Sequence, residues 1–416
     1  MKKYEEYKSI SLPWLNEIPS HWEVRRNKNI FTEMKEEVGV DAPQYTLLSM
    51  TLKGIIPRDM NGGGKFPEQF DKYKIVKKGN MAFCLFDVDE TPRTVGLSNY
   101  DGMLTGAYTI MRIKNINPQY VFFYYLSLDN VKALKPLYTG LRKTININTF
   151  QSTKIPIPPR TEQDQIVKFL DWKITEINKL IAIKTQQIKV YKEFLTAEIE
   201  LQLHKYPVIK TMRLKSLGRF EKGGGFSRDN LLESDGNPAI LYGDIYTKYK
   251  YKTNIITHMV DVAAYYNAPK VSKGDIVFAG TGETKDEIGK PILYYGDETV
   301  AVGGDVIIFH TDKSINAEYI LFHLYSQKSL QCRYIKSKGD IIVHIYPKDL
   351  GDITIPMISN KNKDKVVAAI NLSILRIEKI ISILKSEIDT LHEFKTRLIS
   401  DVVIGQIDVR DIKIPD

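Results

Sequence analysis

Two long stretches of the chain carry apolar residues at helical spacing. In residues 161–204 and 364–404 these residues follow one another mostly at steps of three and four, and neither stretch contains Gly or Pro. A narrow apolar stripe between polar flanks is typical of a helix that packs on another helix along a coiled-coil seam. At a rise of about 1.5 Å per residue, each predicted helix is about 60 Å long.

The two stripes match each other when the sequence is shifted by 200 residues, with identical pairs such as Ile183 and Ile383. Two similar narrow stripes each need a partner. We therefore predict that the helices pair with each other rather than pack separately on their own domains. The predicted seam residues are Leu170, Ile174, Ile177, Ile181, Ile188, Ile370, Ile374, Ile377, Ile381, Leu384 and Ile388.

Each predicted helix follows a short apolar strand that contains the dipeptide Ile-Pro. The first of these junctions reads IPIPPRTEQDQIVKFL (155–170), and the second reads ITIPMISNKNKDKVVAAI (353–370). In the first copy, Thr161 and Asp164 have the spacing of a capping box, in which side chains satisfy free backbone N–H groups at a helix start. We therefore predict that the first helix is capped by Thr161.

The stretches that precede the helices repeat as well. INPQYVFFYYLS (116–127) aligns with INAEYILFHLYS (315–326), and KKGNMAFCLF (77–86) aligns with SKGDIVFAGT (272–281). Both copies place two short strands before a short helix, a polar loop and the Ile-Pro strand, which predicts a mixed α/β (α+β) domain.

The sequence therefore predicts two domains in tandem, separated by two long coiled-coil helices, with an internal pseudo-twofold repeat. The predicted ranges are a first domain at 1–157, a helix at 158–204, a second domain at 205–357, a helix at 358–404 and a tail at 405–416.

Composition narrows the class of protein. The chain has 416 residues, which suits two or three domains, and no run approaches the roughly 18 apolar residues of a membrane span. Only Cys84 and Cys332 are present and the start lacks a signal peptide, so we expect a cytoplasmic protein. The net charge is +9, and residues 1–160 hold 23 basic against 16 acidic side chains, a mild excess that is compatible with phosphate binding.

Two segments resemble a known family. Residues 155–188, IPIPPRTEQDQIVKFLDWKITEINKLIAIKTQQI, are similar to the first spacer helix of the specificity subunits of type I restriction–modification enzymes. The segment LPWLNEIPSHWEV (12–24) is similar to the N-terminal signature of the same family, whereas NKNKDK (360–365) departs from the usual start of the second spacer. The resemblance covers the whole chain.

This resemblance implies a non-catalytic subunit whose two target-recognition domains each read half of a split double-stranded DNA site. The spacer helices would pair antiparallel and hold the two halves at a fixed distance. They would also dock two modification (methyltransferase) subunits, which recruit two restriction (translocase/endonuclease) subunits. S-adenosylmethionine, ATP and magnesium would bind those partners, and this chain would hold no cofactor and no metal.

Two alternatives remain open at this point. NPQY (117–120) and FAGTG (278–282) approach the motifs of a stand-alone adenine-N6 DNA methyltransferase. Their repeat counterparts, NAEY (316–319) and FCLFD (83–87), lack the Pro and both Gly residues, so we interpret Pro118 as the first residue of a helix and Gly280 and Gly282 as loop residues. The second alternative is a coiled-coil interaction scaffold that binds no DNA, which salt-dependent binding to random duplex would exclude.

Candidate DNA-reading residues lie in polar loops, because sequence reading needs side chains that reach base edges. In the first domain these loops are 89–97 and 138–150, and in the second they are 281–287 and 334–346. Lys65 and Lys222, beside Gly-rich stretches, are candidates for phosphate contacts only. The candidates for DNA binding are Arg93, Tyr108, Thr139, Gly140, Arg142, Lys143, Thr144, Lys285, Lys336, Lys338 and His344.

A first prediction concerns Arg142, whose guanidinium has the donor geometry for guanine. If Arg142 is bidentate to a guanine, Arg142→Ala should weaken specific binding by about 1–3 kcal/mol and relax one position of one half-site. Methylation-site sequencing with the assembled enzyme would measure this. A uniform loss over all sequences would identify a phosphate contact instead.

Overall fold

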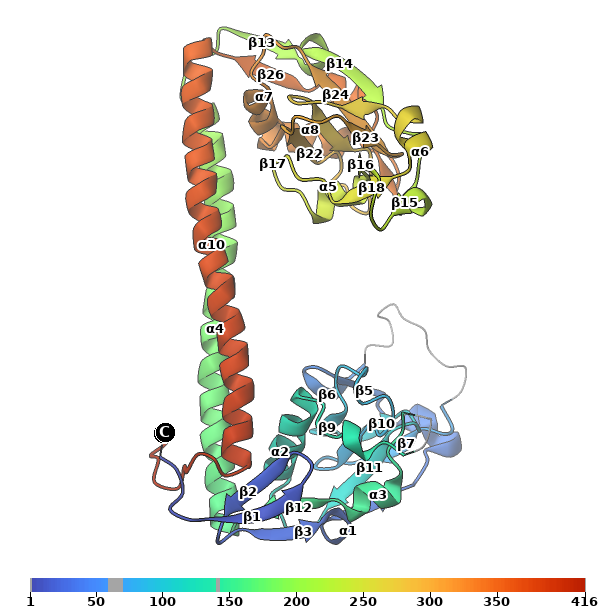
Figure 1. Ribbon diagram of the computed structural model, residues 1–416, viewed down its shortest axis with the longest axis vertical. Helices are drawn as coiled ribbons and strands as arrows, with labels where there is room; N and C mark the ends of the chain where they lie inside the picture. The colour runs from blue at the N-terminus through green and yellow to red at the C-terminus, as the bar shows by residue number, and fades with distance from the viewer. Residues whose placement is uncertain (1, 59–69, 140–142, 416) are drawn as a thin grey trace. The chain divides into compact units, whose positions relative to one another are not determined.

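The computed structural model describes residues 2–58, 70–139 and 143–415 (Figure 1). The chain divides into two compact units: unit 1 holds residues 1–185 and 385–416, and unit 2 holds residues 186–384. The helices predicted at 158–204 and 358–404 are α4 (Arg160–Leu203) and α10 (Asn360–Val403). Both helices pass from one unit into the other, so each unit combines one globular part with half of each long helix.

Unit 1 contains a sheet with the strand order β4–β11–β8–β9, in which neighbouring strands are antiparallel. Its strands are β1 (Tyr7–Leu12), β2 (Leu15–Pro19), β3 (Glu23–Arg26), β4 (Phe31–Met34), β5 (Leu48–Thr51), β6 (Gly54–Pro57), β7 (Lys74–Val76), β8 (Met81–Phe83), β9 (Val95–Leu97), β10 (Gly102–Leu104), β11 (Thr109–Ile113) and β12 (Lys154–Ile157). The short helices are α1 (Asn27–Ile30), α2 (Pro118–Asn130) and α3 (Ile147–Ser152).

Unit 2 contains two sheets with the strand orders β14–β24–β20–β22–β17 and β15–β18–β16–β23–β19. Its strands are β13 (Lys210–Arg213), β14 (Gly218–Lys222), β15 (Leu231–Leu232), β16 (Asn237–Ile240), β17 (Lys252–Thr253), β18 (His258–Val260), β19 (Lys270–Val271), β20 (Ile276–Ala279), β21 (Thr281–Gly282), β22 (Pro291–Tyr294), β23 (Val300–Val302), β24 (Val306–Thr311), β25 (Val343–His344) and β26 (Thr354–Met357). The short helices are α5 (Tyr242–Thr247), α6 (Val262–Asn267), α7 (Ala317–Leu324), α8 (Gln327–Lys336) and α9 (Pro347–Gly351).

Equivalent hydrogen bonds in the two units confirm the internal repeat. In unit 1 the hydroxyl of Tyr120 on α2 donates to the carbonyl of Pro156 at 2.9 Å, and in unit 2 Tyr319 on α7 donates to Pro356 at 2.8 Å. The antiparallel pairs β3–β12 and β13–β26 also have the same register, since Glu23 faces Ile157 and Lys210 faces Met357. The predicted mixed α/β fold with a tandem repeat is confirmed.

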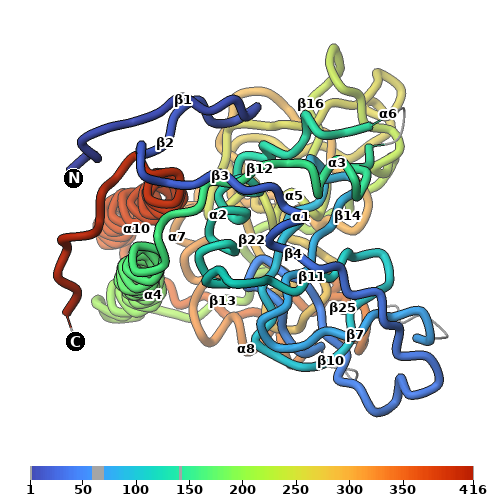
Figure 2. Tube along the Cα trace, turned by 90° about the horizontal axis from the view of Figure 1, so that it is seen from below, coloured from blue at the N-terminus to red at the C-terminus, as the bar shows by residue number. Residues whose placement is uncertain are grey.

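The long helices pair antiparallel within each unit, as predicted, and lie side by side in Figure 2. In unit 1, Lys184 lies 2.8 Å from Glu387, and the Lys395 ammonium donates to the Asn178 side chain at 3.1 Å. Lower residue numbers on α4 thus face higher numbers on α10, so the two helices run antiparallel. In unit 2, residues of both helices share one core cluster: Leu195, Ile199, Leu203, Val366, Val367, Ile370 and Ile377. The predicted seam positions are all buried or half-buried.

The helices also pack on the globular parts, which the seam prediction did not include. Ile166, Phe169 and Leu170 of α4 belong to the same core cluster as Tyr120 and Phe150 of unit 1. Part of each long helix therefore packs on the other long helix, and another part packs on a globular domain.

The start of α4 differs from the predicted capping box. The helix begins at Arg160, and the amides of Glu162 and Gln163 both donate to the carbonyl of Pro159 at 3.0 Å. Thr161 therefore lies inside the first turn. The carboxylate of Asp164 accepts from the Asn117 side chain at 2.7 Å rather than from a capping residue's backbone. The Pro pair before the helix, rather than a hydroxyl cap, sets its start.

A buried carboxylate fastens the N-terminal segment to this helix start. Glu162 is 5% exposed and accepts from the Tyr4 hydroxyl at 2.5 Å and the Trp22 indole at 2.9 Å, and it lies 2.8 Å from His21. The segment after α10 covers the same region, because the amide of Asp408 donates to the carbonyl of Lys2 at 2.9 Å. Both ends of the described chain are thereby joined to unit 1.

We expect Glu162→Ala to destabilise unit 1 by about 3 kcal/mol, because it leaves the buried donors of Tyr4 and Trp22 without an acceptor. Chemical denaturation followed by tryptophan fluorescence would measure the change. Glu176→Ala, at an exposed position of the same helix, is the matched control. Equal stability of the two variants would contradict this role of Glu162.

A third prediction concerns His310 on β24 (Val306–Thr311) of unit 2. Its ring nitrogens lie 3.0 Å from Asp275 and 2.9 Å from Glu221, and these hydrogen bonds raise the pKa of His310 above its usual value. A raised pKa in the folded state means that the ion pairs stabilise unit 2 fully below about pH 6.5 and are lost as the pH rises through the folded pKa.

The unfolding free energy of unit 2 should therefore fall as the pH rises above about 6.5, and His310→Gln should remove this part of the pH dependence. Denaturation curves at a series of pH values would measure both effects. His392→Gln, at an exposed position of α10, should leave the dependence unchanged. If His310→Gln and the wild type show the same dependence of unfolding free energy on pH, the contacts of His310 with Asp275 and Glu221 add no stability.

Candidate DNA interface

In unit 1 the two loops predicted to read DNA meet each other. Phe86 and Thr144 form an isolated antiparallel bridge, and the amide of Asp87 donates to the carbonyl of Lys143 at 2.7 Å. The Lys143 ammonium pairs with Glu90 and lies 3.7 Å from Asp89. The structure thus joins Lys143 and Thr144 to the loop after β8. Gly140 and Arg142 lie outside the described residues.

The loop after β8 is fixed by a buried carboxylate on α2. Asp129 is 2% exposed and accepts from the Thr94 hydroxyl at 2.5 Å and from the Arg93 guanidinium at 2.9 Å. Lys132 adds a third contact to Asp129 at 2.8 Å. The structure gives Arg93 this internal role, and its contact with DNA stays a prediction.

Two further residues of unit 1, Thr139 and Tyr108, were also predicted to contact DNA. The backbone amide of Thr139 donates to the carbonyl of Thr144 at 3.0 Å, which closes the described ends of the loop. Tyr108 is half-buried against the cluster that contains Leu104 and Ile110. Their contacts with DNA stay predictions.

In unit 2 the corresponding loops meet in the same way. Strands β21 and β25 pair so that Thr281 faces His344, and the Thr281 hydroxyl lies 3.0 Å from the Nδ1 atom of His344. The Lys285 ammonium lies 3.8 Å from Asp340, and Lys338 is joined to His344 by two backbone hydrogen bonds. The structure therefore brings together three predicted residues that are up to 59 positions apart, from Lys285 to His344.

Two residues of α8, Arg333 and Lys336, donate hydrogen bonds to groups near these loops. Arg333 is 2% exposed and donates to the carbonyls of Ile288 at 3.1 Å and Leu324 at 2.6 Å, which ties the first loop to two helices. Lys336 donates to Asp352 at 2.7 Å. Lys336 was predicted to contact DNA, but its described partner is internal, so the contact remains a prediction.

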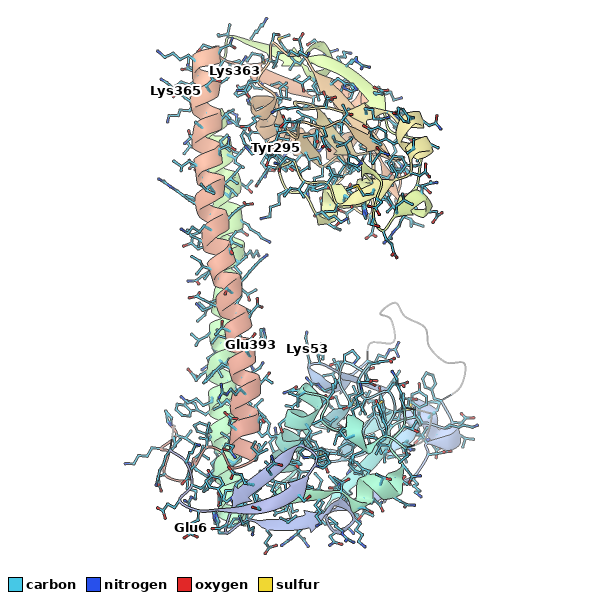
Figure 3. All side chains as sticks on the ribbon, in the orientation of Figure 1. Glu6, Lys53, Tyr295, Lys363, Lys365 and Glu393 are labelled. Atoms are coloured by element: carbon cyan, nitrogen blue, oxygen red, sulfur yellow. The ribbon has the colours of Figure 1, made fainter. Side chains whose placement is uncertain are left out.

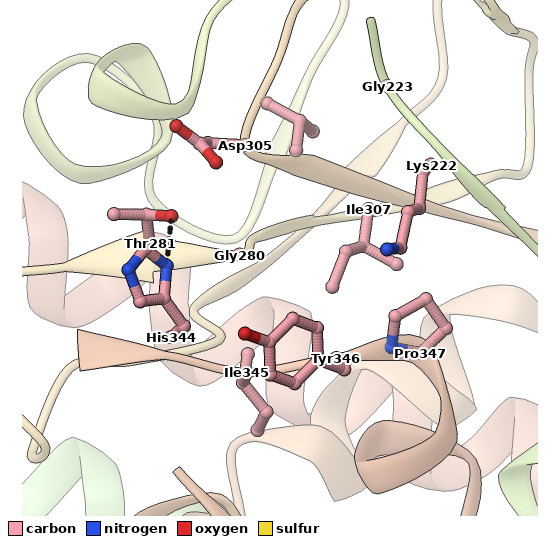
Figure 4. A pocket seen from close by; sticks show the side chains of 11 residues that line it. Lys222, Gly223, Gly280, Thr281, Asp305, Ile307, His344, Ile345, Tyr346 and Pro347 are labelled. Atoms are coloured by element: carbon pink, nitrogen blue, oxygen red, sulfur yellow. Dashed lines mark hydrogen bonds between the residues drawn. The ribbon is translucent and has the colours of Figure 1, made fainter. Parts of the chain in front are cut away.

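A groove beside the loop pair gathers polar groups of several kinds (Figure 4). It has a volume of about 220 Å³ and is lined in part by Lys222, Thr281, Asp305, His344 and Tyr346. The Lys222 ammonium lies 5.6 Å from the ring centroid of Tyr346. A cation, hydroxyls, an imidazole and a carboxylate in one groove can contact phosphates and base edges together.

The sequence flagged Lys222 for phosphate contacts and His344 for DNA reading, but it gave no sign that they lie together. Tyr346 and Asp305 were missed as site residues. Tyr346 ended the predicted loop, and Asp305 precedes β24, where only its positive φ of 60° marks it as unusual. No signal in the sequence alone would have paired Asp305 with His344.

The motifs that suggested a methyltransferase have structural roles. A Cβ atom on Gly280 would lie 2.9 Å from the carbonyl of Asp305, and one on Gly282 would lie 2.8 Å from the Tyr246 hydroxyl. Close packing against a backbone carbonyl requires Gly280, which lies in a loop as predicted. Gly282 lies in the short strand β21 rather than in a loop, so that part of the prediction was wrong. Asn117 caps α2 by accepting from the Gln119 amide at 2.9 Å, and Pro118 is the first residue of that helix, as predicted.

Residues 19–190 match the family model described as the type I restriction modification DNA specificity domain. This part of the chain therefore belongs to the type I restriction–modification DNA specificity domains. The match covers the first globular part and much of α4, and the structural repeat extends the same fold to the second half. None of the curated proteins compared with the chain matches it.

The chain is similar in fold to two solved structures. One, concerned with complex assembly and conformational transition of the type I R-M system, has 13% identity and a TM-score of 0.67, covering 94% of this chain and 99% of that one. The HsdS subunit from Thermoanaerobacter tengcongensis has 14% identity and a TM-score of 0.51, covering 94% and 98%. At these identities the likeness establishes the fold.

The family assignment favours a non-catalytic subunit for DNA sequence specificity over both alternatives, the stand-alone methyltransferase and the scaffold without DNA. Within residues 2–58, 70–139 and 143–415, His, Cys, Asp and Glu form no group of three that could hold a metal. In the same described part of the chain, no helix combines the length and apolar character of a membrane span.

We expect Lys222→Ala to weaken binding to all DNA sequences about equally, because an ammonium beside a Gly-rich turn is suited to phosphate. The slope of log binding constant against log salt concentration should become shallower by about one. Fluorescence anisotropy at several salt concentrations would measure it. Lys273→Ala, an exposed lysine of the same unit, is the control, and equal slopes for both variants would place Lys222 off the DNA.

Proposed function

We propose that this specificity subunit reads a bipartite double-stranded DNA target, one half with the loops of each unit. Support comes from the repeat, because each unit brings the loop after its central strand against the loop before its last short helix. The loops differ in sequence, with Lys143 and Thr144 in unit 1 and Lys285 and His344 in unit 2. Different side chains on equivalent frames are what two different half-sites require.

We further propose that the long helices dock two modification subunits. The observation that carries this is a set of exposed apolar side chains repeated at a shift of 200 residues: Ile183 (56% exposed) with Ile383 (52%), and Phe194 (55%) with Phe394 (46%). Each unit holds one isoleucine and one phenylalanine of this set, drawn from the two helices. Exposed apolar groups gathered on one element mark interaction sites, and two equivalent sets fit two equal partners.

The remaining parts of the proposal concern the assembly. Two restriction subunits join through the modification subunits, and S-adenosylmethionine, ATP and magnesium bind to those partners rather than to this chain. Because the proposed assembly acts on double-stranded DNA, we place it in the cytoplasm. The isolated chain should accordingly neither methylate nor cleave DNA, and methyl transfer by the isolated chain would overturn the proposal.

The docking proposal is tested by the double variant Phe194→Glu, Phe394→Glu. Burial of a phenylalanine side chain contributes roughly 1.5–3 kcal/mol, so the variant should bind modification subunits more than tenfold more weakly at each site. Native mass spectrometry of titrated mixtures would count the bound subunits. DNA binding by the isolated chain should stay unchanged.

Leu52→Glu serves as the control, since Leu52 is 68% exposed but lies outside the long helices. It should take up two modification subunits like the wild type. If the double variant also takes up two with normal affinity, these residues are not the docking surface.

A further inference from the structure

The two long helices begin at equivalent places in the repeat, but their surroundings differ. The common register of β3–β12 and β13–β26 makes Ile209 the counterpart of Trp22, one residue before the first strand of each pair. Trp22 is fully buried, whereas Ile209 is 70% exposed. An equivalent position is therefore covered at the start of α4 and open at the start of α10.

The cover in unit 1 comes from both ends of the described chain. The ring of Tyr4 lies 5.9 Å from that of Trp22, and a Cβ atom on Gly405 would lie 3.2 Å from the Trp22 ring. In unit 2 the chain enters β13 directly from α4, and no described segment of that unit takes the place of residues 2–22. The internal repeat thus shows where a covering segment belongs and that unit 2 lacks one.

The open position is a groove rather than a flat surface. It has a volume of about 420 Å³, and its lining includes Ile209, Lys210, Met212, Asn360 and Lys363. This volume falls in the range of about 300–1,000 Å³ of pockets that enclose organic groups rather than single ions. Its walls are mainly apolar, so an apolar side chain would be removed from water there.

The polar groups at the groove are reversed relative to unit 1. Glu162 and Gln163 of α4 correspond to Asn362 and Lys363 of α10. Gln163 is satisfied by the Asn117 amide at 2.8 Å and the Pro158 carbonyl at 2.9 Å. In unit 1 the Glu162 carboxylate accepts a hydrogen bond from Tyr4 of the covering segment, whereas in unit 2 the neutral Asn362 stands in its place and the cationic Lys363 follows it.

Lys363, labelled in Figure 3 at the start of α10, is buried to 6% exposure. Its ammonium donates to the Asn360 side chain at 3.1 Å and lies 5.8 Å from the ring of Tyr319. It forms no ion pair with the described residues. Burial lowers the pKa of Lys363 and nearby Lys210 lowers it further, while the charge of the neighbouring Asp364 carboxylate only partly opposes this shift. A buried ammonium whose described hydrogen-bond acceptor is an amide calls for an anionic partner.

A second unsatisfied group lies behind Tyr319. In unit 1 the Tyr124 hydroxyl accepts from the Trp14 indole of the covering segment at 3.0 Å. Its counterpart His323 is buried, and within the described residues its Nε2 atom has no partner. Burial also holds the pKa of His323 at about 3. The unpaired imidazole is a further mark of the missing cover.

We propose that this groove binds a segment of a modification subunit in which a carboxylate lies beside an apolar side chain. The carboxylate would pair with Lys363, and the apolar side chain would lie against Ile209 and Met212. The assignment rests on the proposed function, because that function supplies the partner. Its consequence is that the two docking sites are unequal, since only unit 2 has the groove.

DNA phosphate is the other anion that Lys363 could meet, but two observations favour a protein. The groove is lined mainly by apolar side chains, which phosphate does not match. The DNA-reading loops of unit 2 lie beside α5, because Tyr242 and Thr247 line a pocket with Thr281 and His344. Figure 1 shows α5 and β13 at opposite sides of the globular part of unit 2.

The test uses the full chain with Ile209→Asp and, separately, Lys363→Met. Ile209→Asp places a carboxylate on the chain itself, where it neutralises Lys363 and repels the partner's carboxylate. Lys363→Met removes the charge and keeps an apolar side chain of similar length. Val208→Asp is the matched control, because Val208 is 53% exposed and does not line the groove. Thermal unfolding shows that each variant is folded.

Titration with modification subunits, followed by native mass spectrometry, should give two bound subunits for the wild type and for Val208→Asp. Both groove variants should retain one subunit and bind the second at least tenfold more weakly, with unchanged DNA binding by the isolated chain. The double variant at Phe194 and Phe394 should instead weaken both sites, which separates this assignment from the docking proposal.

Full uptake of two subunits by both groove variants would overturn the assignment. Reduced DNA binding by the isolated Lys363 variant would identify a phosphate site instead. Dimers of the wild-type chain that Ile209→Asp abolishes would identify a second copy as the occupant. A wild-type chain that takes up no modification subunit would overturn the proposed function, and with it this assignment.

Discussion

The constraint on which the rest of the structure depends is that the apolar stripes of the two long helices must be covered along their whole length. Within each unit, half of each helix meets half of the other, and the helix end that begins there also packs into the core of the globular part. Because the apolar stripe of each long helix packs on both the other long helix and the globular part, it holds the helix start, the Ile-Pro strand before it and the short helix α2 or α7 together. The hydrogen bonds from Tyr120 to Pro156 and from Tyr319 to Pro356 show the same joint in both units.

This packing of helix start, strand and short helix supports the candidate DNA-reading loops. Each loop pair is attached to the sheet at one side and to a short helix at the other, through Asp129 in unit 1 and Arg333 in unit 2. The two anchors have opposite charge and come from different positions in the repeat. The same loop arrangement is therefore held by different chemistry, so the side chains that face DNA can differ while the frame stays the same.

The repeat is close in the backbone and imperfect in the polar groups at the helix starts. Glu162 binds the N-terminal segment through hydrogen bonds from Tyr4 and Trp22, while the corresponding residue of unit 2 is Asn362. A buried carboxylate is stable where several donors converge on it, and a buried ammonium needs the reverse. Glu162 thus lies at a helix start that this chain itself covers, whereas Lys363, beside the Asn362 that replaces Glu162, lies at the helix start that we propose a partner covers.

Much of the architecture followed from the sequence, because apolar periodicity and its repetition at a shift of 200 residues are local properties. They determined the two helices, the tandem mixed domains and the mutual pairing of the helices, while the family resemblance added the antiparallel direction and the role in DNA specificity. The helix start at Arg160 was missed, because Thr161 and Asp164 fit a local rule that the Pro pair and Asn117 override. The grouping of Lys222, Asp305 and Tyr346 with His344, the internal partners of Arg93 and Lys336, and the open groove at Ile209 were decided by tertiary structure alone. Each depends on residues far apart in the chain, and burial and charge pairing between such residues leave no periodic trace in the sequence.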